Sequence, residues 1–201
     1  LGQNSHAEGF NTTSSGQNSH AEGSNSIASG QNSHSEGWGT TANGGASHAE
    51  GYFTTTLSSY AHAQGSGTTA SSYSSHAEGS GTFAYGMASR AEGYLTTTLA
   101  DYAHAEGNLT TALGIASHAE GELSTAYFES SHAEGYNSIA YGQSSHAEGS
   151  SVTVGVNSHA EGYSTWADGD TSHAEGLQTY AYGQSSHAEG YFTFSSRSEE
   201  H

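Results

Sequence analysis

Histidine and glutamate, which can transfer protons and bind metal ions, recur together along the whole chain. They share a five-residue motif, Ser-His-Ala-Glu-Gly, that first occurs at residues 5–9. Fourteen copies occur among the 201 residues, each 14 residues after the last except for one step of 13 between His146 and His159. The His and Glu positions, with their two replacements, form what we call the His–Glu column: His6, Glu8, His20, Glu22, His34, Glu36, His48, Glu50, His62, Gln64, His76, Glu78, Arg90, Glu92, His104, Glu106, His118, Glu120, His132, Glu134, His146, Glu148, His159, Glu161, His173, Glu175, His187 and Glu189.

The repetition of this column limits the chemistry that it could perform. A catalytic site is normally one constellation in which a nucleophile lies against its base. Here Ser and His adjoin in most copies and point to opposite sides of a strand, so we expect no catalytic residues and no enzyme. His and Glu two residues apart could ligate zinc-like ions, but the fold alone explains the uniform spacing and Arg90 would repel a metal ion. We therefore expect no metal site and no cofactor, with an ion at a few levels as the open alternative.

The composition excludes two classes of partner. The chain has 20 acidic residues against two arginines and no lysine, for a formal net charge of −18. Nucleic acids and anionic membrane surfaces are bound through Lys and Arg, so the sequence predicts neither. The apolar runs are too short to cross a bilayer, so no membrane insertion is expected. The chain has no Cys and therefore no disulfide framework.

A second, looser motif lies between the copies of the first. It reads Ser/Thr-x-Ala-x-Gly, as in residues 26–30, 82–86 and 138–142. Alternation with a period of two indicates β-strands. Each 14-residue unit is then one coil of two short strands, and successive coils stack in parallel about 4.8 Å apart. Only small residues share one face of each strand, so we expect that face inside the coil, with Gly at the corner in a positive-φ or closely approached position.

The repeat also defines the expected domain organisation. One all-β repeat domain covers residues 1–194, and residues 195–201 are a C-terminal tail or an exit into a further domain. The 13-residue step is best placed at the corner after Gly149, because the alternation of residues 151–155 is then kept. Since the chain starts at Leu1 within a repeat, we expect it to be a segment of a longer protein.

The spacing of these motifs resembles a known family. Ser-x-Ala-x-Gly every seven residues, as in residues 26–30 (Ser-Ile-Ala-Ser-Gly) and 151–155 (Ser-Val-Thr-Val-Gly), resembles the YadA-like head repeats of trimeric autotransporter adhesins. The Ser-His-Ala-Glu-Gly version is similar to repeats of phage and prophage tail-fibre proteins. The resemblance covers residues 2–194 and implies a left-handed parallel β-roll, a homotrimer and a role in attachment at a virion or cell surface. His and Glu depart from the aliphatic pairs that are usual in adhesin heads.

Two interpretations of the His–Glu column concern assembly. In the first, its side chains face neighbouring chains and form hydrogen bonds across the trimer interface. Arg90 beside Glu92 and His62 beside Gln64 favour this interpretation, because both exceptions keep a donor beside an acceptor. In the second, the column faces solvent and the second motif faces the trimer axis, which avoids the cost of burying charge. We take the first as the working interpretation, a trimer-interface ladder.

The outward positions of the second motif form what we call the variable column. Thr recurs in it at positions 13, 41, 55, 69, 97, 111 and 125, and a flat Thr ladder resembles an ice-binding surface. If this column is exposed, its aromatic residues and those of the corners could stack on sugars or contact a receptor. The candidate receptor-binding residues are Trp38, Phe83, Tyr85, Tyr127, Tyr141, Trp166, Tyr180 and Tyr182.

These observations together predict a structural attachment element. We expect a rigid trimeric rod from a phage tail fibre or a bacterial surface adhesin that binds a host receptor or glycan. The alternative from another class is an ice- or surface-binding solenoid that uses the Thr ladder. The sign of the pH dependence stays open at this stage, because pairing with Glu raises the pKa of a His whereas burial lowers it.

Overall fold

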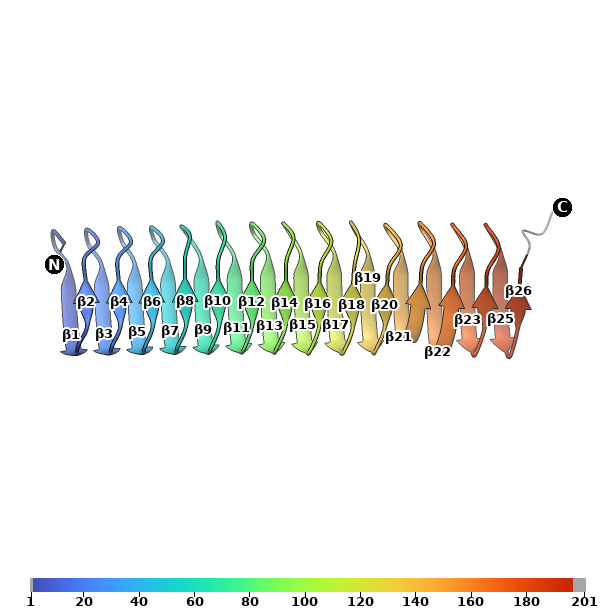
Figure 1. Cartoon of the computed structure of the whole chain (residues 1–201), viewed down its shortest axis with the longest axis horizontal. Helices are drawn as coiled ribbons and strands as arrows, with labels where there is room; N and C mark the ends of the chain where they lie inside the picture. The colour runs from blue at the N-terminus through green and yellow to red at the C-terminus, as the bar shows by residue number, and fades with distance from the viewer. Residues whose placement is uncertain (1, 197–201) are drawn as a thin grey trace. The chain divides into compact units, whose positions relative to one another are not determined.

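The chain consists of two compact units built from the same β-coil. A computed structural model describes residues 2–196, which divide between a first unit, residues 2–102, and a second unit, residues 103–196. Each unit contains seven coils, and each coil takes a longer stretch of strand from the Ser-His-Ala-Glu-Gly motif and a shorter one from the second motif (Figure 1). The described residues contain no helix, and thus none that could span a membrane.

The first unit alternates five-residue strands with two-residue strands. The long strands are β1 (His6–Phe10), β3 (His20–Ser24), β5 (His34–Trp38), β7 (His48–Tyr52), β9 (His62–Ser66), β11 (His76–Ser80) and β13 (Arg90–Tyr94). The short strands are β2 (Thr13–Ser14), β4 (Ile27–Ala28), β6 (Thr41–Ala42), β8 (Thr55–Thr56), β10 (Thr69–Ala70), β12 (Phe83–Ala84) and β14 (Thr97–Thr98).

The second unit follows the same scheme except in two coils, where the long and the short strand are continuous. Its long strands are β15 (His104–Asn108), β17 (His118–Glu122), β19 (His132–Tyr136), β23 (His173–Leu177) and β25 (His187–Tyr191). Its short strands are β16 (Thr111–Ala112), β18 (Thr125–Ala126), β20 (Ile139–Ala140), β24 (Tyr180–Ala181) and β26 (Phe194–Ser195). The two continuous strands are β21 (His146–Thr153) and β22 (His159–Ala167).

Equivalent positions of successive coils pair in parallel register within each unit. In the first unit His20 pairs with His34, and Ala28 pairs with Ala42. In the second unit His118 pairs with His132. The predicted parallel β-solenoid of 14-residue coils is therefore confirmed, while its left-handed sense stays a prediction.

The inside of each coil is lined by small side chains. The Ala residues of both motifs, such as Ala21 and Ala119, are fully buried, and so are Thr and Ser residues such as Thr40 and Ser138. The first Ser of the Ser-His-Ala-Glu-Gly motif turns inward, and the Ser33 hydroxyl donates a hydrogen bond to the Gly30 carbonyl at 2.7 Å. The predicted small-residue interior is confirmed, and Thr is the largest side chain that is fully buried among the described residues.

The corners recur every seven residues and require unusual backbone conformations. A residue in the left-handed region stands at each described corner except the one after Gly149, and the first five are Asn4, Asn11, Asn18, Asn25 and Asn32, with φ between 54° and 57°. Asn adopts this region more readily than most residues. Later corners force it on bulkier residues, such as Leu95 at φ 52°.

The Gly of the first motif has both of the expected properties. Gly37 has a φ of +120°, and a Cβ there would overlap the Gly51 carbonyl oxygen of the next coil. A side chain at this position would thus strain the backbone and push the coils apart.

The 13-residue step lies at the corner after Gly149, as predicted from the sequence. The pairing between β21 and β22 aligns Ser150 with Tyr163 and Ser151 with Thr165, so Ser164 has no counterpart in the preceding coil. The missing residue therefore belongs to the corner after Gly149. Both paired strands, β21 and β22, continue through their corners.

The end of the chain was expected to leave the repeat after residue 194. Ser195 is the last residue of β26 and pairs with Ala181. The rest of the predicted tail, residues 197–201, lies outside the described residues. A single repeat domain over residues 1–194 stays a prediction.

Candidate functional site

The His–Glu column lies on the outer face of the coils, and equivalent side chains of successive coils lie one above another. The imidazole rings of successive coils stand 4.6 to 5.1 Å apart between centroids within each unit. From His104 to His159 the rings are stacked nearly parallel, with interplanar angles of 1° to 9°. From His6 to His62 they are tilted by 59° to 80°.

In most coils the Glu of the column lies beside the His of its own strand. The distance between His Nε2 and Glu Oε2 is 3.4 to 3.9 Å in ten of the coils. These side chains are half-buried, with exposures of 34% for His118 and 43% for Glu120. At this exposure the pairs contribute little to the stability of one chain.

The two residues that replace His or Glu in the column, Arg90 and Gln64, also form polar contacts with its carboxylates. Arg90 lies 2.6 Å from Glu92, and this carboxylate is also 3.4 Å from His76 Nε2 in the preceding coil. Gln64 donates a hydrogen bond to Glu50 of the preceding coil at 3.3 Å. The pairing predicted for Arg90 and Glu92 is therefore present within the chain, while pairing between chains stays a prediction.

Burial lowers the pKa of seven histidines in the column below the ordinary value of 6.5, and the neighbouring histidines lower it further. Their own and adjacent carboxylates, or in one case Gln64, oppose this shift only in part. The seven are His48, His62, His118, His132, His146, His159 and His173. These imidazoles are therefore neutral at neutral pH, and each carries one N–H donor and one acceptor nitrogen.

Several of these rings have an unused nitrogen. The Nε2 atoms of His118, His132, His146 and His159 are shielded from solvent and form no hydrogen bond. Leaving such an atom without a partner costs free energy. The column thus offers unsatisfied nitrogens next to carboxylates, an arrangement suited to a partner that supplies donors, acceptors or a cation.

Nucleophilic catalysis is not supported by the geometry of the described motifs. The Ser117 hydroxyl donates to the Gly114 carbonyl inside the coil, whereas the His118 ring lies on the outside. Ser and His of one motif are therefore on opposite sides of the strand, as the sequence predicts.

The variable column also stacks in register. Thr41 pairs with Thr55, and Thr55 pairs with Thr69, so three threonines lie one above another in the first unit. Ile27 precedes this run and Phe83 follows it. In the second unit the Tyr127 and Tyr141 rings stack at 4.4 Å.

The eight candidate receptor-binding residues do not meet in one site. Trp38 lies at a corner and stacks on Tyr52 at 4.9 Å, whereas Phe83 stacks on Tyr85 within one coil. In the second unit Trp166 and Tyr180 occupy adjacent levels of the variable column, and Tyr182 stacks on Tyr180.

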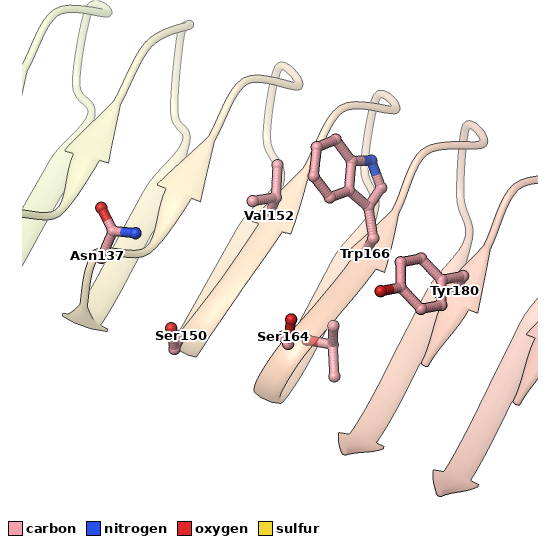
Figure 2. A pocket seen from close by; sticks show the side chains of 7 residues that line it. Asn137, Ser150, Val152, Ser164, Trp166 and Tyr180 are labelled. Atoms are coloured by element: carbon pink, nitrogen blue, oxygen red, sulfur yellow. The ribbon is translucent and has the colours of Figure 1, made fainter. Parts of the chain in front are cut away.

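A pocket of about 280 Å³ opens beside Trp166 (Figure 2). Val152, Trp166 and Tyr180 contribute from three successive levels of the variable column. The pocket is lined by Asn137, Ser150, Val152, Ser164, Thr165, Trp166 and Tyr180. Trp166 is 40% exposed, so part of its side chain is accessible to a ligand.

Sequence reasoning found Trp166 and Tyr180 but missed the polar lining. Asn137, Ser150 and Ser164 are corner residues of three different coils. The 13-residue step was the available signal, because Ser164 is the residue without a counterpart at that step.

Comparison with known families supports the same repeat. The YadA head domain repeat matches residues 7–33, 105–127 and 133–153. These three segments carry YadA-like head repeats. A search of curated proteins finds no match to the chain.

The YadA-like repeats agree with the coil described above, since the matched residues include both motifs and the corners between them. They indicate an adhesin-like surface element of a structural kind. The similarity to phage tail-fibre proteins stays a prediction.

Proposed function

We propose that the chain forms a homotrimeric attachment element at a cell or virion surface and that its His–Glu column lies at the interface between chains. The observation that carries this proposal is the row of half-buried, in-register imidazoles whose Nε2 atoms form no hydrogen bond. A neighbouring chain would complete these contacts. YadA-like repeats support three chains, because YadA heads are trimeric.

The interior supports association for a second reason. It consists of Ala, Ser, Thr and Gly, which bury little apolar area per residue. Large side chains lie instead on the outside, where Tyr73, Tyr102 and Ile115 are more than half exposed. Association of chains adds the buried area that a single coil lacks.

Engineered cysteines test which face lies at the interface, because the chain has no Cys of its own. We expect Glu134→Cys in the His–Glu column to form interchain disulfides on mild oxidation. Asp168→Cys, in the variable column of the same unit, is the matched control and should stay monomeric on a non-reducing gel. Cross-linking of the second variant alone would place the variable column at the axis and overturn the proposal.

The finer proposal is that the exposed variable column contacts a host receptor or glycan. The Trp166 pocket supports it, because an exposed indole beside hydroxyl and amide groups can stack on a sugar ring and bind its hydroxyls. We expect Trp166→Ala to abolish binding to the ligand found on a glycan array or on host cells. Trp38→Ala in the first unit should retain it, and equal loss in both variants would contradict the pocket's role.

The ice-binding alternative rests on the in-register run of Thr41, Thr55 and Thr69. Phe83 and Ile27 bound this run, so the flat surface spans three levels. A thermal-hysteresis assay separates the two functions. We expect no activity, and clear activity that is lost in Thr55→Tyr would favour the alternative over attachment.

A further inference from the structure

Three side chains of the second unit converge on one point of the His–Glu column. A ring nitrogen of His118, a carboxylate oxygen of Glu120 and a ring nitrogen of His132 all lie within 4.8 Å of one another. The next level repeats the arrangement with His132, Glu134 and His146. His132 belongs to both trios, so an ion in one trio excludes an ion from the other.

The nitrogens in these trios are available for coordination. The Nε2 atoms of His118, His132 and His146 form no hydrogen bond and are shielded from solvent by their neighbours. Neutral imidazole is the form that binds a metal ion, and it predominates above the ordinary His pKa of about 6.5.

The donor set suits a borderline divalent cation. Two imidazole nitrogens and one carboxylate, with water in the fourth position, are a common zinc ligand set, with bonds of about 2.0–2.2 Å. The three ligand atoms must each move by about 1 Å toward an ion placed between them to form bonds of that length. They can do so because His118 is 34% exposed and Glu120 is 43% exposed, on the outer face of the coil.

Arg90, which was expected to repel a metal ion, belongs to the first unit, where it pairs with Glu92 at 2.6 Å. Residues 103–196 contain neither Lys nor Arg, so no fixed cation competes for their carboxylates. The parallel stack from His104 to His159 also lies entirely in this unit.

We propose that the second unit binds a divalent transition-metal ion such as Zn²⁺ through His132 and either His118 with Glu120 or His146 with Glu134. All ligands come from one chain, so the site goes beyond the proposed trimer and does not depend on it. A neighbouring chain or water would supply the remaining position.

The test is calorimetric titration of the whole chain, freed of metal with a chelator, with ZnCl₂ at about pH 7.5, where unperturbed His is neutral. We expect saturable binding and a loss of one ion per chain in His132→Ala, which removes a ligand from both trios. His20→Ala, in the tilted part of the column, is the matched control and should bind as the unaltered chain does. Circular dichroism checks that both variants keep the fold.

A conservative variant and a spectroscopic readout sharpen the test. We expect Glu120→Gln combined with Glu134→Gln to weaken Zn²⁺ binding by about tenfold or more. Loss of a hydrogen-bonding partner outside the ligand set already weakens metal affinity to that extent. Co²⁺ in place of Zn²⁺ should give the visible absorption of a tetrahedral site, lost in His132→Ala. No saturable binding to the unaltered chain, or equal binding by His132→Ala, would overturn the proposal while leaving the cross-linking test of the trimer unaffected.

Discussion

The inside of the coil and the His–Glu column outside it are both nearly uniform along the chain, but for different physical reasons. Inside, Ala63 and Ala119 are fully buried, and the largest side chain that is fully buried among the described residues is Thr. Outside, His118 and Glu120 are one third to one half exposed, so packing within one chain does not dictate their identity. Uniformity inside follows from steric exclusion, whereas uniformity outside requires contacts between levels or between chains.

Breaking the close approach of successive coils should have the largest effect. Gly121 has a φ of +98°, and a Cβ there would overlap the Gly135 carbonyl oxygen of the next coil. We expect Gly121→Val to lower the free energy of unfolding by about 3 kcal/mol or more, from backbone strain and overpacking together. Chemical denaturation measures it. Glu122→Val, one residue further on an exposed position, should change stability by less than about 0.5 kcal/mol, and similar losses in both would contradict the steric account.

Breaking the His–Glu column should act on assembly more than on the fold of a chain. In Glu120→Lys combined with Glu134→Lys, each imidazole loses its carboxylate and gains a like-charged neighbour when protonated. We expect association to weaken by about 2 kcal/mol or more, measured by sedimentation in the presence of a chelator. Asp168→Lys reverses one charge in the same way in the variable column, which is half of that charge change. Its association should be unchanged, and an equal effect would contradict the distinction between the two columns.

Acid should weaken the outer column and spare the interior. Seven histidines of the column have a lowered pKa because of burial and neighbouring histidines. The unfolded chain then binds protons at a higher pH than the folded chain, so stability rises with pH up to about 6.5 and is lost as the pH falls below it. We expect the melting temperature to drop between about pH 7 and pH 5. A rise on acidification would mean that carboxylates of another chain pair with charged imidazoles.

The smallest effect is expected at the exception in the column, Gln64. Its amide donates a hydrogen bond to Glu50, and Gln64→Glu replaces this donor with a second carboxylate. Because the site is half-buried, we expect a loss of about 0.5 kcal/mol or less in thermal unfolding. Gln31→Glu, at an exposed corner where Gln31 donates to Gln17, is the control. A large loss at Gln64 alone would show that the column stabilises the single chain.

The sequence was sufficient for the features that sterics impose. The period of two, the small-residue face and the 13-residue step predicted the coil, its interior and the corner after Gly149. It was not sufficient for features set by side-chain rotamers, such as the parallel rings from His104 to His159 or the convergence of His118, Glu120 and His132. The lining of the Trp166 pocket by Asn137 and Ser164 depends on how three corners project, which residue types alone do not reveal.

The central claim is that the His–Glu column brings three chains together. Sedimentation equilibrium of the unaltered chain in a chelator-containing buffer at neutral pH tests it most directly. The account predicts one species with three times the chain mass of 20.6 kDa at micromolar concentration. A single-chain mass under these conditions would contradict it.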